Sequence, residues 1–156
     1  MTAITSLTPA ISSELTISQY RDPSRFYRTR EGLYVRDSFL QLAVANTHPT
    51  EMGTIVKLNS TQITQDMRDY EIRKMLPTQH VFDKSQALAV IEELITLQWN
   101  GEEGLLVTKG DVVNLFFIDS CPITVMWCPS KPWWGLVAWA PYLISQSGTR
   151  VFYPGD

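Results

Sequence analysis

The sequence predicts a single α+β domain, in which an antiparallel β-meander of about five strands in the C-terminal half is covered by N-terminal and central helices. Three observations lead to this prediction. The chain has 156 residues, enough for one sizeable core but few for two. Helical periodicity dominates up to residue 98, and period-two alternation follows it. Short connections between neighbouring strands favour antiparallel pairing, and helices followed by strands are typical of α+β folds.

The first element is predicted to be a loose arm over residues 1–18, ahead of a domain that spans residues 19–156. The arm is rich in Thr and Ser, has weak periodicity and offers at most a short strand near residues 15–17. It has no basic region followed by a continuous apolar run, so no secretory signal is expected.

Two helices are predicted between this arm and the middle of the chain. Asp37 or Ser38 can cap a helix that ends before Pro49, with a hairpin as the alternative. Asp66 or Asp69 can cap a second helix, which ends at the next proline. Short strands are expected beside these helices, at residues 32–35 and 54–58.

The clearest helix is predicted over residues 85–98. Apolar residues fill about half of its circumference, and a narrow arc remains for polar residues that include Glu92 and Glu93. The helix is therefore expected to show only one stripe to water, with both carboxylates solvated. The Asn-Gly pair that follows residue 99 supplies the C-terminal stop.

Five short strands are predicted after this helix, because the hydrophobic period changes to two and turn signals separate the apolar segments. These segments are residues 104–107, 112–118, 123–128, 134–140 and 149–153. Only two residues between 112 and 149 are charged, Asp119 and Lys131. The sheet must then be covered on both faces, and the long helix is expected to cover one of them.

Composition excludes several classes of protein. With 44% hydrophobic residues the chain is not a disordered tail, and its net charge of −3 argues against a nucleic-acid coat protein or a polybasic membrane binder. The longest uncharged apolar stretch, residues 133–144, contains Gly and Pro and is shorter than the roughly 20 residues of a membrane span. No membrane association and no nucleic-acid partner are therefore expected.

The cysteine pattern predicts a cytoplasmic protein with two free thiols. Cys121 and Cys128 flank one apolar run, and on a strand their Cα atoms would lie about 23 Å apart, too far for a disulfide. His48 and His80 are distant from both cysteines, and no metal-ligand spacing occurs. No cofactor is expected.

Four of the five tryptophans fall within thirteen residues, at positions 127, 133, 134 and 139. Trp134 and Trp139 would face opposite sides of a strand, so the rings cannot all share one core. Trp133 and Trp134, at a strand entrance after Pro132, are the candidate binding residues of this cluster. Such rings anchor protein interfaces or stack on sugars, bases or proline-rich peptides, and the alternative is that they fill the core.

Residues 20–36 carry five arginines, no lysine and four aromatic residues, and their net charge of +3 leaves −6 for the rest of the chain. Guanidinium groups bind carboxylates or phosphates through two hydrogen bonds and stack on aromatic rings. Arg25, Tyr27, Arg28 and Arg30 are the candidate binding residues, a composition common in protein interfaces. Pairing with the acidic remainder of the chain is the alternative, and nucleic-acid binding is a weaker one.

Local catalytic motifs are absent from the sequence, which has no nucleophile elbow, phosphate-binding loop or dinucleotide fingerprint. The sequence therefore favours a non-enzymatic protein-binding or accessory module, such as an inhibitor or adaptor from a virus or mobile element. Its partner would be another protein or a second copy of the chain. The alternative is a small enzyme or ligand-binding domain, with a pocket lined by Trp133, Trp134 and either His80 or Asp119.

Overall fold

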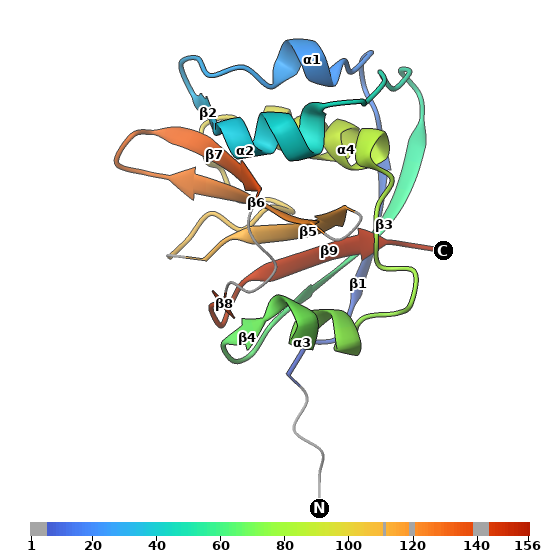
Figure 1. The fold of residues 1–156 in the computed structure, drawn as a ribbon, viewed down its shortest axis with the longest axis vertical. Helices are drawn as coiled ribbons and strands as arrows, with labels where there is room; N and C mark the ends of the chain where they lie inside the picture. Colours follow the sequence, from blue (N-terminus) through green and yellow to red (C-terminus); the bar gives the residue numbers. More distant parts are fainter. Residues whose placement is uncertain (1–5, 111, 119–120, 139–143) are drawn as a thin grey trace, which may run out of the picture.

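A seven-stranded mixed sheet forms the centre of the fold (Figure 1). The computed structural model describes residues 6–110, 112–118, 121–138 and 144–156. In sheet order the strands are β1 (Ile11–Thr16), β3 (Ile55–Gln62), β9 (Arg150–Pro154), β5 (Asn114–Ile118), β6 (Cys121–Cys128), β7 (Trp133–Ala138) and β2 (Leu33–Val35). A second, two-stranded sheet pairs β4 (Met67–Arg68) with β8 (Ile144–Ser145).

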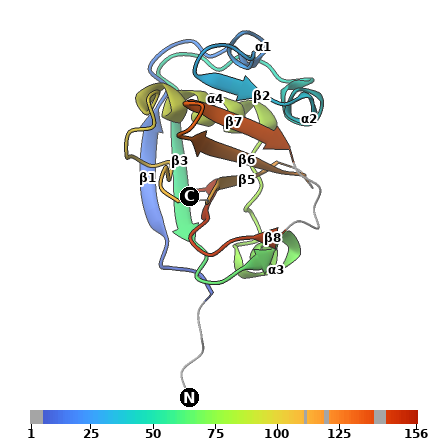
Figure 2. The same ribbon diagram turned by 90° about the vertical axis from the view of Figure 1, so that its left-hand side faces the viewer.

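Helices lie on both sides of the main sheet. They are α1 (Pro23–Phe26), α2 (Asp37–Phe39) with its π-helical continuation Leu40–Val44, α3 (Asp69–Met75) and α4 (Lys84–Leu97). Figures 1 and 2 show α4 across one face of the sheet with α1 and α2 beside it, whereas α3 lies on the opposite side next to β4 and β8. Within the described residues, no helix is long and apolar enough to cross a membrane.

The three predicted helices are all present. The long helix begins after Asp83, whose carboxylate accepts a hydrogen bond from the Gln86 N–H group. The caps predicted for the other two helices are wrong: their N-cap residues are Arg68 and Arg36, and Asp69 and Asp37 are the first helical residues.

The chain forms one domain of mixed α and β structure, but the predicted purely antiparallel meander is wrong. Strands β5, β6 and β7 do form such a meander. Strand β9, however, runs parallel to β5 and antiparallel to β3, and β2 runs parallel to β7. Short turns determine the pairing only of strands that are adjacent in the chain, so these long-range pairs left no signal.

Residues 104–107 were expected to form the first of the five strands, but the chain bends there and forms no strand. The buried side chain of Gln98 takes the place of a neighbouring strand: its amide donates to the Leu106 carbonyl (3.0 Å), and its oxygen accepts from the Leu106 N–H group (2.9 Å). A side chain thus satisfies backbone groups that the alternation had assigned to a sheet.

The predicted loose arm also needs correction, because residues 11–16 form edge strand β1. It pairs antiparallel with β3 from Ile11 opposite Ser60 to Thr16 opposite Ile55. Only one side of this strand is packed, and Leu15 is its one buried residue. One buried leucine among Ser, Thr and Glu residues is too little to produce a recognisable hydrophobic period.

Two apolar cores lie on the two faces of the sheet. The larger core packs α4 residues such as Ile91 against Phe116 and Phe152, whose rings stack with centroids 4.7 Å apart. The smaller core packs Ile72 of α3 against Leu115 and its neighbours on the opposite face. Both faces of this part of the sheet are therefore covered, as its low charge requires.

A buried ion cluster joins the segment before α1 to α4. Arg21 lies between two carboxylates, with Nη1 2.9 Å from Glu92 Oε2 and Nη2 2.9 Å from Glu93 Oε1. Ser18 donates to Glu93 from its backbone N–H and its hydroxyl. The expectation that both carboxylates are solvated is wrong, because Glu92 is 5% and Glu93 3% exposed. These two carboxylates face residues 18–21 rather than water.

The two carboxyls of this cluster have pKa values that move apart. Burial raises the pKa of Glu92 to about 7, although the hydrogen bond and charge of Arg21 act against it. Burial would also raise the pKa of Glu93, but hydrogen bonds from Ser18 and Arg21 outweigh it, so that pKa is lowered. The Glu92 carboxylate is stabilised less than that of Glu93, because its Oε1 has no hydrogen-bond partner among the described residues.

Candidate functional site

The two segments that the sequence singled out meet in one surface groove, which we call the Trp–Arg groove. Its volume is about 630 Å³. The walls come from the turn before β2, the segment after α4 and the hairpin between β6 and β7. The lining residues are Thr29, Arg30, Glu31, Gly32, Trp99, Asn100, Trp127, Lys131, Pro132 and Trp133.

The first wall is positioned by the parallel pairing of β2 with β7, in which Leu33 lies opposite Trp134. The turn before β2 is closed by reciprocal backbone hydrogen bonds between Arg30 and Leu33 (2.9 and 3.0 Å). Gly32 in this turn has φ +86°, and a Cβ atom there would lie 2.8 Å from the Trp99 ring. Glycine is therefore required both for the turn and for the close approach of Trp99.

The second wall is positioned by the loop after α4. The Gln98 amide donates to the Glu102 and Leu106 carbonyls (2.7 and 3.0 Å), and Gly101 turns the chain with φ +76°. A side chain at Gly101 would overlap the Trp127 ring, so this ring rests directly on the bare backbone. The groove is thus built from aromatic rings pressed against two glycines.

The cationic groups of the groove are held against aromatic rings. The Arg30 guanidinium lies 5.0 Å from the Phe26 ring centroid and 5.7 Å from that of Trp99. Its Nη1 also donates to the backbone carbonyls of Phe26 and Arg28. These contacts fix the guanidinium in place before any partner arrives, which lowers the entropy cost of binding.

Aromatic rings and cations continue beyond the groove along the sheet edge. Trp133 stacks on Tyr34 with ring centroids 4.9 Å apart and planes 18° apart. Lys131 Nζ lies 5.9 Å from the Trp133 ring centroid, and the Arg36 guanidinium 5.9 Å from that of Tyr34. Together they form a row at the surface in which two stacked rings lie between two cations.

The structure brings together two of the six predicted binding residues, Arg30 and Trp133, in this groove. Arg25 and Arg28 are exposed but do not line it. Arg25 Nε lies 3.8 Å from Asp22 Oδ2, and Arg28 Nε donates to the Ser24 carbonyl (3.3 Å).

Tyr27 and Trp134, the remaining two, are core residues and cannot contact a partner in the folded chain. The Tyr27 hydroxyl donates to the Leu88 carbonyl of α4, and burial raises the Tyr27 pKa well above its ordinary value. Trp134 is fully buried, with its indole N–H 2.8 Å from the Gln98 carbonyl oxygen. Strand alternation sends Trp134 toward α4 and Trp133 outward, which the sequence could not assign without the sheet.

Two other predicted residues are placed differently. His80 is half-buried away from the groove: its Nε2 accepts from Arg73 Nη1 (3.3 Å), and its Nδ1 lies 2.8 Å from the Pro77 carbonyl oxygen. Trp139 and Asp119 lie outside the described residues. Trp99 was not among the predicted binding residues, because it stands apart from the tryptophan cluster and its only signal in the sequence is its place before the Asn-Gly helix stop.

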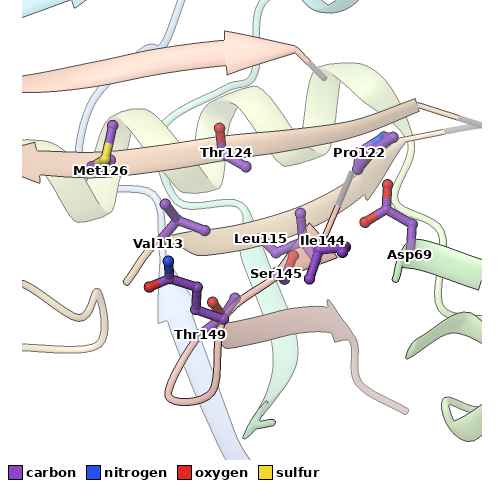
Figure 3. Close-up of a pocket in the computed structure, with 10 residues that line it drawn as sticks. Asp69, Val113, Leu115, Pro122, Thr124, Met126, Ile144, Ser145 and Thr149 are labelled. Carbon is purple, nitrogen blue, oxygen red and sulfur yellow. The ribbon is translucent and has the colours of Figure 1, made fainter. Parts of the chain in front are cut away.

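A second cavity, the Asp69 pocket, lies on the sheet face opposite α4 and has a volume of about 430 Å³ (Figure 3). Its lining residues are Asp69, Val113, Leu115, Pro122, Thr124, Met126, Ile144, Ser145, Gln146 and Thr149. The pocket that the sequence predicted was to be lined by Trp133 and Trp134. Neither residue takes part in this one.

Asp69 is the ionisable residue of the pocket. It is the first residue of α3 and only 3% exposed, and its Oδ2 has no hydrogen-bond partner among the described residues. Burial raises the pKa of Asp69 to about 6, and the charge of Arg73 offsets this only in part. Above pH 6 the pocket thus contains a buried carboxylate.

No protein-family model, curated protein or solved structure matches this chain. Its function is therefore inferred from the groove and the pocket.

Asp69→Asn is expected to change how stability depends on pH. The folded pKa of Asp69, about 6, lies above its ordinary value of 3.8. Its favourable contribution is therefore complete below pH 3.8 and is lost as the pH rises through 6. The variant should be about 1 to 2 kcal/mol more stable than the wild type at pH 7.5 and no more stable at pH 4. Urea unfolding at both pH values measures this, with exposed Asp37→Asn, at the same position of α2, as the unaffected control.

Proposed function

We propose that this protein is a non-enzymatic protein-binding module that receives an extended acidic segment of a partner protein in the Trp–Arg groove. The observation that supports this function is the convergence of three partly buried tryptophan rings with two exposed cations. Trp and Arg are the residues most enriched among the energetic centres of protein interfaces.

The chemistry of the lining favours a partner that is extended and acidic. Flat aromatic walls grip the rigid polyproline II conformation, which loses little entropy on binding. Two cations, Arg30 and Lys131, line the groove, whereas Glu31 is the one carboxylate among its lining residues. Exposed Arg28 and Arg36 lie nearby. This local positive charge, on a chain whose net charge is −3, would steer an acidic segment to this face.

A reducing, cytoplasmic setting is part of this proposal. Neither Cys121 nor Cys128 is in a disulfide, and the two occupy opposite ends of the extended strand β6. Thiols that far apart on one strand cannot form a disulfide with each other.

A peptide titration tests the groove. With ¹⁵N-labelled protein, a Glu-Pro repeat peptide should shift the indole N–H signals of Trp99, Trp127 and Trp133 and leave that of buried Trp134 unchanged. A Lys-Pro repeat peptide should not bind. Arg30→Glu should weaken binding of the acidic peptide at least tenfold, because it removes the fixed guanidinium and adds a like charge. The matched control is Lys57→Glu, which reverses an exposed charge on β3.

Three results would contradict the proposal. The first is equal binding of the acidic and basic peptides, and the second is a set of shifts that spares the three groove tryptophans. The third is displacement of the acidic peptide by an oligonucleotide at much lower concentration, which would indicate nucleic-acid binding. Light scattering checks one further occupant: a dimer that Trp133→Ala dissociates would mean that the groove receives a second copy of the chain.

A further inference from the structure

We propose that the Asp69 pocket binds a small organic amine, whose apolar body packs against β5 and β6 and whose ammonium group pairs with the Asp69 carboxylate. This site lies apart from the Trp–Arg groove and shares no lining residue with it. The inference is therefore independent of the proposed protein-binding function.

The size and lining of the pocket fit a small molecule with an apolar body. About 430 Å³ lies within the usual range for ligand sites. The walls are mostly apolar. Val113 directly precedes β5, Leu115 lies in β5, Met126 in β6 and Ile144 in β8. An aromatic or alicyclic ring would exchange contact with water for contact with these side chains.

Two buried polar atoms indicate where a ligand would bind. Buried polar groups in folded proteins are nearly always hydrogen-bonded. Among the described residues three buried side-chain atoms lack a partner, and two of them, Asp69 Oδ2 and Thr149 Oγ1, belong to residues that line this pocket. Asp69 is 3% and Thr149 1% exposed, so bulk water does not readily satisfy them.

The charged and titratable groups described around Asp69 leave its Oδ2 without a hydrogen-bond donor. On α3 its charged neighbour is Arg73, whose guanidinium lies 4.2 Å from the Phe117 ring centroid and donates to His80. On β6 the neighbouring titratable group is the Cys121 thiol, whose pKa is raised by burial, so it stays neutral near pH 7. The ammonium group of a ligand would supply the donor that Oδ2 lacks, and a buried charge of this kind is stable only when paired.

The arrangement of polar groups also limits the shape of the ligand. Figure 3 shows Asp69 and Thr149 on different sides of the pocket, with Leu115 and Ile144 between them. An amine that carries a second hydrogen-bonding group at the far end of its apolar body would reach both.

The test is a methyl NMR titration of the full chain with three probes of one skeleton. These are 2-phenylethylamine, neutral 2-phenylethanol and anionic phenylacetate. At pH 7.5 the amine should shift the methyl signals of Val113, Leu115, Met126 and Ile144. The alcohol should bind at least tenfold more weakly, and phenylacetate should not bind.

Variants and pH separate pairing with Asp69 from simple apolar binding. Asp69→Asn should weaken amine binding at least tenfold and leave alcohol binding unchanged, whereas Asp37→Asn should change neither. In the wild type, lowering the pH from 8 to 5 should weaken amine binding about tenfold as Asp69 takes up a proton, because the amine itself stays charged. This second measurement needs no variant, so a folding defect cannot obscure the result.

Several results would overturn the inference. Equal affinity for amine and alcohol would show an apolar cavity without charge recognition. Amine binding that survives Asp69→Asn or pH 5 would exclude Asp69 as the partner. Shifts of the groove indole signals in place of the pocket methyl signals would assign the amine to the other site. Unchanged methyl signals at millimolar amine would show that the pocket does not bind this class of molecule.

Discussion

Arg21→Met is expected to lower the free energy of unfolding by about 3 to 5 kcal/mol at pH 8. Arg21 is the cation of the buried cluster, within 2.9 Å of both Glu92 and Glu93. Methionine keeps the apolar length of the side chain but leaves two adjacent carboxylates buried without a counter-ion. Urea unfolding followed by tryptophan fluorescence measures the loss, and exposed Arg25→Met is the matched control, expected to stay within about 0.5 kcal/mol of the wild type.

The pH dependence of the Arg21→Met variant distinguishes charge from packing. Without Arg21 the pKa values of Glu92 and Glu93 should both rise, so protonation toward pH 5 should recover much of the stability. Adding Glu92→Gln and Glu93→Gln should recover it at pH 8. A loss that is equal at both pH values and persists in the triple variant would mean that Arg21 acts through packing alone.

Trp134→Ala is expected to cost about 3 to 5 kcal/mol, whereas Trp133→Ala should cost about 1 kcal/mol or less. Trp134 is fully buried, packs on Trp127 with ring centroids 5.4 Å apart and donates to the Gln98 carbonyl. Trp133 is partly exposed and stacks on Tyr34 at the surface. Urea unfolding of the two variants compares adjacent residues of the same type on opposite faces of one strand.

A conservative variant separates the two contributions of Trp134. Trp134→Phe keeps a ring but leaves the Gln98 carbonyl without this donor, so its cost should lie between those of the two alanine variants. Equal costs for Trp133→Ala and Trp134→Ala would contradict the assigned strand orientation. A binding experiment on the groove must therefore use Trp133, because Trp134→Ala would disturb the loop that carries Trp99 and Gly101.

Elements with strong local patterns could be predicted from the sequence. Apolar residues fill about half of the circumference of α4, and the period-two segments of β6 and β7 lie between clear turn signals. Only the end of strand β1, near residues 15–17, could be predicted, because an edge strand with one buried side chain carries almost no pattern. The position of β9 between β3 and β5 could not be predicted either, since sheet order depends on contacts distant in sequence.

The candidate site could be predicted only in part, for the same reason. Composition identified Arg30 and Trp133, but their meeting depends on the parallel pairing of β2 with β7. The helical wheel marked Glu92 as solvated because a wheel cannot show that Arg21 lies opposite. Asp69 had the features of an ordinary helix start, and the pocket that it lines includes Ile144 and Ser145 of β8, distant from it in the sequence.

The place of β9 has a consequence for how the chain acquires its structure. The last strand in sequence is the one that joins β1 and β3 to β5, β6, β7 and β2. Until it is inserted, the chain consists of two separate groups of strands, each with an open edge able to pair wrongly. Closure of the sheet is thus a late event that depends on contacts distant in sequence, which slows folding. The groove lies on the larger of the two groups, and the pocket combines β5 and β6 of that group with α3 and β8. Because β9 pairs with β5, the pocket reaches its final support only when residues 150–154 are in place.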